Sequence, residues 1–257
     1  MVMKNIKVIF VCGFLLLSAV VGVLYLLRKR FPTSLTGQQQ NTVLGPFSFV
    51  ITLYAFLLGF TVVNLWQTFD QADRTAAKEA ETAGVLYLLT DSFPESQSAR
   101  RTLIHYVESV AQEEWPAMAG GNISPKTEAL YIKVWQEVRG LVPASAKEQA
   151  IYAELLAKLG NLTDYRRDRI LLIDGSIPSI MWWSILFGGL LLFVGLYYLG
   201  TGTRDQIVID IIVLGMLFIT LYLAVEFNSP FSGNLTVSPR AFQFIGEKMM
   251  QSQGVWQ

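Results

Sequence analysis

Four stretches of the sequence stay apolar for about 20 residues each, and this feature limits the possible folds more than any other. They run from about Val8 to Leu27, from Gly45-Pro46 to about Trp66, from about Ile180 to Leu199, and from about Ile207 to Phe227. A helix that crosses a bilayer needs this length, whereas a helix on the surface of a soluble domain keeps a polar face. Charged residues make up 16% of the chain, against about 25% in soluble proteins. The sequence therefore predicts an all-α membrane protein with four transmembrane helices.

The first apolar stretch has some features of a signal peptide, because Lys4 and Lys7 precede it. A signal peptide has an apolar region of about 7–15 residues and a cleavage site made of small residues. This stretch is longer, and it ends in Arg28-Lys29-Arg30. We expect it to be retained as a transmembrane helix.

The distribution of basic residues predicts the orientation in the membrane. Four spans place both termini and the long connection between the second and third stretches on one side. On that side, nine basic residues lie near the spans: Lys4, Lys7, Arg74, Lys78, Arg166, Arg167, Arg169, Arg240 and Lys248. The side of the two short loops has four: Arg28, Lys29, Arg30 and Arg204. Because basic residues favour the cytoplasmic side, we expect cytoplasmic termini in a cell inner (plasma) membrane, although the triplet Arg28-Lys29-Arg30 argues for the opposite orientation.

The long connection reads as a helical domain. The expected organisation is transmembrane helices 1 and 2 in 1–66, a helical cytoplasmic domain in 67–178, transmembrane helices 3 and 4 in 179–228, and a cytoplasmic tail in 229–257. The second helix is expected to continue beyond the membrane, since no Gly or Pro occurs between Trp66 and Gly84. Ser124-Pro125 and the pattern from Ser145 to Glu148 predict two further helix starts.

Chemistry-bearing patterns are scarce. The chain has one cysteine, Cys12, and one histidine, His105, so neither a disulfide within the chain nor a multi-histidine metal site in one subunit is expected. It has no phosphate-binding loop, zinc-ligand spacing or nucleophile elbow. Lys+Arg and Asp+Glu both number 20, and no basic patch indicates nucleic acid. We expect no enzyme activity, no catalytic residue, no cofactor and no metal.

Several short segments carry a resemblance to a known family. They are Tyr54-Ala-Phe-Leu-Leu-Gly-Phe, Trp66, Phe69, Ala72, Glu79 and Ala80, then Glu114-Trp115-Pro116-Ala117-Met118, Tyr152-Ala-Glu-Leu-Leu, Arg166-Arg167, Ile177-Pro178 and Pro230-Phe231-Ser232-Gly233. In their order and spacing, from about Tyr54 to Phe242, they resemble the bestrophin-like domain family. The resemblance implies a fold with four spans, cytoplasmic termini and a helical cytoplasmic domain between spans 2 and 3. Bestrophins are homopentameric anion channels whose second helix lines the pore and forms an apolar neck. The acidic cluster that binds calcium in bestrophins has no counterpart here, so calcium gating is not implied.

The second span is the candidate pore helix. The candidate pore-lining and gate residues are Thr52, Phe56, Gly59, Phe60, Val63 and Asn64. A ring of apolar and aromatic side chains gates a pore by dewetting. The alternative is ordinary packing, in which small residues let membrane helices approach and aromatic residues fill the gaps.

At the start of this helix, Arg30 and Gly45 are the candidate anion-attracting vestibule. Gly45-Pro46 is expected to begin the helix, and the free amides of a helix N-terminus attract anions. Rings of positive charge in an oligomer favour anion entry. Anchoring at lipid headgroups is the alternative, and we favour it for Arg28 and Lys29.

Other charged residues near the spans have structural interpretations. Asp210 and Glu226 lie at opposite ends of the fourth stretch, where they can reach the membrane surface, and Asp210 suits the helix dipole. Arg166, Arg167 and Arg169 are expected to set the topology or to meet lipid phosphates.

Two functions fit the sequence. The first is an oligomeric ion channel that conducts anions, with membrane lipids and inorganic ions as partners and a pentamer implied by the resemblance. The second is a non-conducting membrane sensor or scaffold whose helical domain binds a protein partner. A closed ring of subunits distinguishes the channel, whereas a scaffold works as a monomer or dimer. A carrier is third, since the internal repeat common in transporters is absent.

Overall fold

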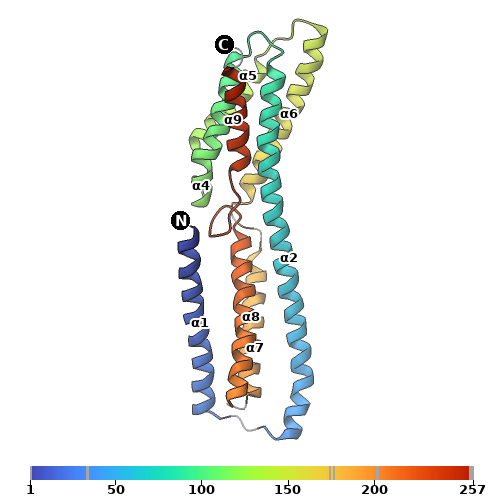
Figure 1. Ribbon diagram of the computed structural model, residues 1–257. Helices are drawn as coiled ribbons and strands as arrows, with labels where there is room; N and C mark the ends of the chain where they lie inside the picture. The colour runs from blue at the N-terminus through green and yellow to red at the C-terminus, as the bar shows by residue number, and fades with distance from the viewer. Residues whose placement is uncertain (1, 33–34, 174, 176, 201–202, 255–257) are drawn as a thin grey trace. The chain divides into compact units, whose positions relative to one another are not determined.

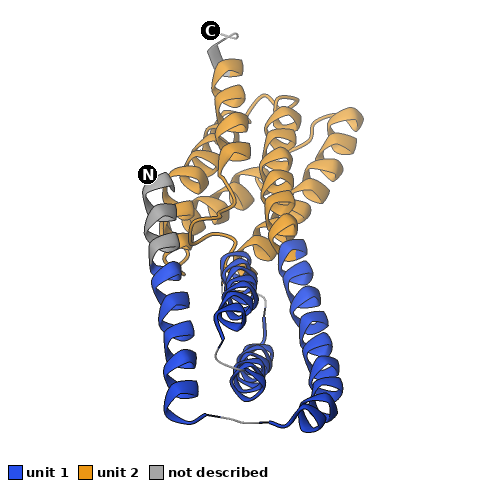
Figure 2. Ribbon diagram, turned by 60° about the horizontal axis from the view of Figure 1, so that its bottom comes forward, with its two compact units in different colours: residues 1–67, 176–228 blue, residues 68–175, 229–257 orange. Residues whose placement is uncertain are grey.

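The computed structural model describes residues 2–32, 35–173, 175, 177–200 and 203–254, and side chains from Cys12 to Ser252. Within those residues every regular element is helical. The elements are α1 (Val2–Arg30), α2 (Gly37–Thr90), α3 (Gln97–Ser109), the π-helix η1 (Val110–Glu114), α4 (Trp115–Ala119), α5 (Pro125–Arg139), α6 (Ala146–Leu171), α7 (Ser179–Leu199), α8 (Arg204–Asn228) and α9 (Arg240–Gly254), as labelled in Figure 1. They form two compact units, coloured in Figure 2: unit 1 holds 1–67 and 176–228, and unit 2 holds 68–175 and 229–257.

Four of the described helices, α1, α2, α7 and α8, are long and apolar enough to cross a membrane. Each coincides with one of the apolar stretches in the sequence, so the predicted number of spans is confirmed. Figure 1 shows α2 as one unbroken helix of 54 residues. The expected continuation of the second span beyond Trp66 is therefore present.

The predicted start of α2 at Gly45-Pro46 is wrong. The helix begins at Gly37, and Pro46 lies inside it. A capping box explains the earlier start, because the Thr36 amide donates to the Gln39 side-chain oxygen (3.0 Å) and the Gln39 amide donates to the Thr36 hydroxyl (3.5 Å). Gly45 is consequently an interior residue of the helix, and the free amides of the N-terminus belong to the turn that starts at Gly37.

In unit 1, glycines of α7 lie against aromatic rings of α2. A Cβ atom on Gly195 would lie 1.8 Å from the Phe47 ring, and one on Gly188 would lie 2.2 Å from the Tyr54 ring. The Tyr54 hydroxyl donates to the carbonyl oxygen of Ile185 (2.9 Å), which fixes the ring in this contact. Close approach at small residues is how membrane helices gain packing energy when burial from water contributes little.

Unit 2 has a continuous apolar core to which the C-terminal segment contributes. The expected tail, 229–257, does not stand apart: Phe231, Val237, Phe242 and Met249 are all buried in this core. The indole N–H of Trp115 donates to the carbonyl oxygen of Val237 (2.9 Å). The segment after α8 and helix α9 therefore belong to the same unit as α3 to α6.

Candidate functional site

A long exposed face of α2 carries the predicted pore residues. It forms an apolar groove of about 600 Å³, lined by Ile51, Thr52, Ala55, Phe56, Gly59, Phe60 and Val63. Five of the six predicted positions lie in this lining, and Asn64 is exposed outside it. The arrangement brings the predicted residues onto one surface of one helix.

The chemistry of this face is apolar. The rings of Phe56 and Phe60 stack with centroids 6.3 Å apart, and both side chains are about two-thirds exposed, at 63% and 66%. The Thr52 hydroxyl donates to the carbonyl oxygen of Ser48 (2.8 Å), so its polar group is turned onto the helix backbone. No charged residue belongs to the lining of this groove as described.

The end of α1 divides the basic triplet into two environments. Lys29 and Arg30 are exposed, and the Arg30 guanidinium lies 5.2 Å from the centre of the Phe31 ring. Arg28 is 6% exposed and forms an ion pair with Asp210 of α8, with 2.5 Å between Nη1 and Oδ2. The interpretation of Arg28 as a headgroup anchor is therefore wrong, and Asp210 is a buried partner rather than a residue that reaches the membrane surface.

Further contacts fix Arg28 in unit 1. Its Nη2 donates to the carbonyl oxygen of Leu196 (2.5 Å), and the Gln206 amide donates to Asp210 (3.1 Å). A Cβ atom on Gly200 would lie 2.1 Å from the guanidinium, so only glycine fits there. The ion pair connects α1 to α8 and also binds the end of α7. The sequence signal for it was an arginine and an aspartate at the same end of two different spans.

Unit 2 contains a second set of buried charges, which the sequence interpretation missed. Arg169 of α6 donates to Glu79 of α2 through Nε (2.6 Å) and Nη2 (2.9 Å), and to Glu114 of η1 through Nη2 (2.7 Å). Arg166 donates to Glu114 through both terminal nitrogens (2.7 and 2.8 Å) and to Glu128 of α5 (2.9 Å). We call Glu79, Glu114, Arg166 and Arg169 the charged core.

These contacts correct the interpretation of the basic residues near α7. Arg166 and Arg169 are 2% and 0% exposed, so they contact neither lipid phosphates nor solvent. Only Arg167 is exposed, and it pairs with Asp164 (3.1 Å). A spacing of three residues places Arg166 and Arg169 on the same face of α6. The buried carboxylates on α2 and η1 are their partners, and no local pattern in the sequence pairs residues so far apart.

Burial and the neighbouring arginines shift the pKa of Glu114 in opposite directions. Burial raises the pKa of Glu114, but Arg169 and Arg166 outweigh it and hold the pKa below its usual value. Burial raises the pKa of Tyr106 well above its usual value, and the neighbouring Glu79 carboxylate adds to the rise. The Tyr106 hydroxyl donates to Glu79 (2.5 Å). Glu114 is therefore ionised and Tyr106 is neutral at neutral pH.

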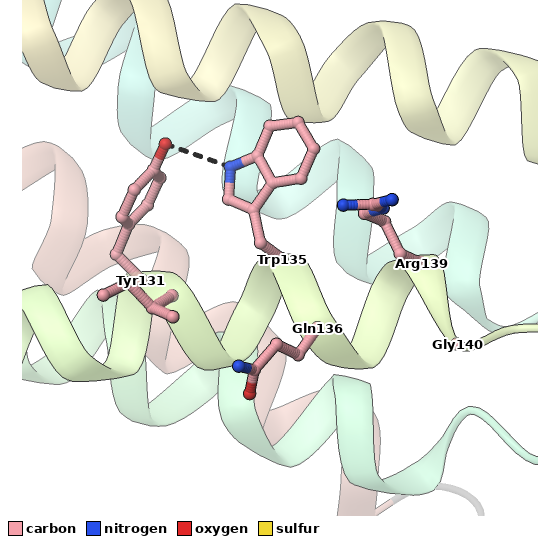
Figure 3. A pocket seen from close by; sticks show the side chains of 6 residues that line it. Tyr131, Trp135, Gln136, Arg139 and Gly140 are labelled. Carbon is pink, nitrogen blue, oxygen red and sulfur yellow. Dashed lines mark hydrogen bonds between the residues drawn. The ribbon is translucent and has the colours of Figure 1, made fainter.

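A groove of about 730 Å³ runs along α5 on the surface of unit 2. Figure 3 shows Tyr131, Trp135 and Arg139 pointing to one side of the helix and Gln136 to the other. The Trp135 indole N–H donates to the Tyr131 hydroxyl (3.0 Å) and to Thr163 of α6 (3.1 Å). These polar groups are thus used to pack α5 against α6. Among the described residues, no group of three or more His, Cys, Asp and Glu side chains is placed to hold a metal.

The geometry defines a class: a helical membrane protein whose second span exposes an apolar face and continues into a domain with a charged core. The family model for the Bestrophin-like domain matches residues 14–242, and the chain belongs to this family. The resemblance inferred from the sequence is confirmed. None of the curated proteins compared with the chain matches its sequence.

Solved structures show the same fold. A bacterial bestrophin homologue from Klebsiella pneumoniae is similar with a TM-score of 0.71 at 14% identity, over 95% of this chain and 98% of that chain. Two variants of that homologue give TM-scores of 0.71 and 0.70 at 16% and 15% identity, over 96% and 93% of this chain and 99% and 98% of theirs. The chain therefore has a bestrophin fold along nearly its whole length.

Proposed function

We propose that this protein is an oligomeric anion channel of the inner (plasma) membrane, whose pore is lined by the exposed face of α2. The observation that carries the proposal is the apolar groove with Phe56 and Phe60 on that face. Large aromatic side chains alternate there with Thr52, Ala55 and Gly59, which leaves a surface of varying width. Repeated around an axis, such a surface makes an apolar constriction that gates by dewetting.

The proposal requires an oligomer, and the exposed α2 face of a single copy is consistent with that requirement. Unit 1 packs α2 through its other side, where Tyr54 and Leu58 are buried. A ring formed by heterologous contacts would place every copy of the exposed face at the axis. Five copies is the number implied by the resemblance to bestrophins.

Selectivity for anions is supported by charge on the short-loop side of unit 1. Lys29 and Arg30 are exposed there, and the first turn of α2 contains no acidic residue. The free amides of that turn, which begins at Gly37, favour negative charge in the same way that we first expected for Gly45. Arg30 thus stays in the proposed vestibule, and the helix start at Gly37 takes the place of Gly45.

The pairing of basic residues also supports cytoplasmic termini. Arg28, Arg166 and Arg169 are buried in ion pairs, so they act less as free charges near the spans. Without them, the side of the termini keeps seven basic residues near the spans and the short-loop side keeps three. The bias that predicts cytoplasmic termini persists.

Conductance of the purified protein in planar bilayers under a salt gradient tests the function. We expect discrete currents whose reversal potential indicates anions over cations. Phe56→Ala and Phe60→Ala should increase the current, because they shorten the apolar constriction. Leu53→Ala is the matched control, since Leu53 is an exposed residue of α2 outside the groove.

Selectivity is tested separately with Arg30→Gln, which should shift the reversal potential toward that of a non-selective pore. Arg204→Gln, an exposed arginine at the start of α8, is the control. A purified protein that is monomeric or dimeric and silent would overturn the channel and favour the sensor or scaffold. A reversal potential that indicates cations would overturn the anion assignment alone.

A further inference from the structure

The chain passes between the two units at three places, and each passage continues a membrane-spanning helix. The first lies within α2 at 67/68, the second between α6 and α7 at 175/176, and the third after α8 at 228/229. These three segments are the covalent connections between unit 2 and the spans.

Arg169 lies on, or contacts side chains next to, each of the three segments that lead to these passages. It is bonded to Glu79 on the unit 2 part of α2, as described above. It lies on α6 two residues before the helix ends at Leu171, on the chain that leads to α7. Its guanidinium lies 5.4 Å from the centre of the Trp115 ring and 5.7 Å from that of Phe242.

Trp115 extends this contact to the third passage. Its ring packs edge-on against Phe231 with centroids 5.5 Å apart, and its N–H binds the Val237 carbonyl oxygen. Phe231 and Val237 belong to the segment that follows α8. One guanidinium therefore contacts the α2 part, the α6 end and the aromatic side chains that hold the segment after α8.

We propose that Arg169 is a positioning residue that couples the three segments leading from unit 2 to spans α2, α7 and α8, so that they move together. The proposed channel makes this coupling a control of opening, and that consequence rests on the proposed function. The coupling itself is a property of unit 2 and does not depend on conduction.

The role requires the shape of arginine as well as its charge. Nε and Nη2 serve Glu79, Nη2 also serves Glu114, and Nη1 lies 2.8 Å from the sulfur of Met118. The planar guanidinium makes these bonds in fixed directions, whereas a lysine ammonium offers one compact charge. Arg169→Lys therefore keeps the charge and removes the simultaneous contacts.

Arg166 provides a matched control. It lies one turn earlier on α6, is equally buried, and also donates to Glu114. Its other contacts are Glu128 of α5 and the rings of Tyr106 and Tyr131, none of which lies on a segment leading to a span. Arg166→Lys thus removes a comparable set of bonds on the same helix without touching the segments of the first and third passages.

Hydrogen–deuterium exchange of the purified full-length protein tests the coupling. In Arg169→Lys, exchange of residues 68–80, 166–173 and 229–237 should increase together, by about tenfold, as expected when charge-assisted hydrogen bonds are lost. In Arg166→Lys, exchange should increase in η1 and α5, with 229–237 unchanged. An increase in 166–173 alone for Arg169→Lys would overturn the proposal.

Two further measurements separate coupling from folding and from conduction. Glu79→Gln removes one partner of Arg169 and should increase exchange in 68–80 while 229–237 stays protected; unchanged exchange in 68–80 would contradict the proposal. If the wild-type protein conducts, Arg169→Lys should change the open probability several-fold at constant unitary current and reversal potential. A changed reversal potential would overturn the gating consequence, and a silent wild-type protein would overturn the channel while the exchange result still decides the coupling.

Discussion

The two units differ in how their buried charged side chains are paired. In unit 2, Arg169 and Arg166 share Glu114, and each guanidinium has a second carboxylate partner, Glu79 for Arg169 and Glu128 for Arg166. In unit 1, Arg28 pairs with the single carboxylate of Asp210, and the Nε of Arg28 has no hydrogen-bond partner among the described residues.

The same contrast holds for apolar surface. At most 22% of the residues in the most apolar stretch of each candidate span are buried. The core of unit 2, by contrast, joins side chains from all its described helices. Unit 2 thus has an apolar core of its own within one copy of the chain. Unit 1 leaves most of its apolar surface exposed in one copy of the chain, so the ion pair of Arg28 and Asp210 is prominent among its specific contacts.

The largest effect is expected in unit 2, for Glu114→Ala. The substitution leaves two buried guanidinium groups without a shared carboxylate, and breaking a buried pair costs about 3–5 kcal/mol. We expect the unfolding temperature of the purified protein in detergent to fall by about 10 °C or more. Arg167→Gln, on the same helix as the two arginines but in an exposed pair, should change it by less than about 2 °C. If Glu114→Ala barely lowers the unfolding temperature, the charged core does not stabilise unit 2.

A smaller effect is expected in unit 1, for Asp210→Leu. This change leaves one arginine without its partner inside the span region, which costs about 2.5–3.5 kcal/mol. The double variant Arg28→Leu with Asp210→Leu should recover most of the lost stability, because no charge remains unpaired. Thermal unfolding of the wild type, both single variants and the double variant measures the coupling. If the double variant is as unstable as Asp210→Leu alone, the ion pair is not the cause.

Packing in unit 1 gives the next effect. Gly195→Ala forces a methyl group against the Phe47 ring, and overpacking of this kind costs about 1–3 kcal/mol. Gly22→Ala is the control, since a Cβ atom there would meet nothing within 4 Å. Detergent stability should fall for Gly195→Ala and stay unchanged for Gly22→Ala. Equal stability of the two variants would mean that α2 and α7 are free to separate.

The sequence predicted what periodicity and length determine. The four spans follow from apolar runs, and the caps at Ser124 and Ser145 are confirmed because a capping residue acts within one turn. The start of α2 was missed because proline at a first helical position is a strong signal, while the capping box at Thr36 to Gln39 precedes a polar turn that shows no apolar periodicity.

The residues that meet across long separations could not be predicted. Arg169 and Glu79 are 90 positions apart, and Arg28 and Asp210 are 182 apart. Nothing near either arginine marks it as buried, so both were read as surface charges. Five of the six predicted pore residues could be placed on one face because they belong to a single helix, for which spacing alone decides the face.

Lowering the pH is expected to change stability least, and the effect should come from unit 2, where Glu114 titrates. The pKa of Glu114 is lower in the folded protein than in the unfolded chain, where a glutamate titrates near about 4.3. Below that value the unfolded chain binds a proton that the folded protein does not, so stability is present above about pH 4.3 and falls as the pH drops toward the folded pKa. One such group changes stability by at most about 1.4 kcal/mol per pH unit.

The unfolding temperature should be nearly constant from about pH 7 to 5 and should decline below it. The double variant Arg28→Leu with Asp210→Leu should keep this decline, because the titrating group lies in unit 2; a profile that becomes flat in the double variant would assign the acid sensitivity to unit 1 instead.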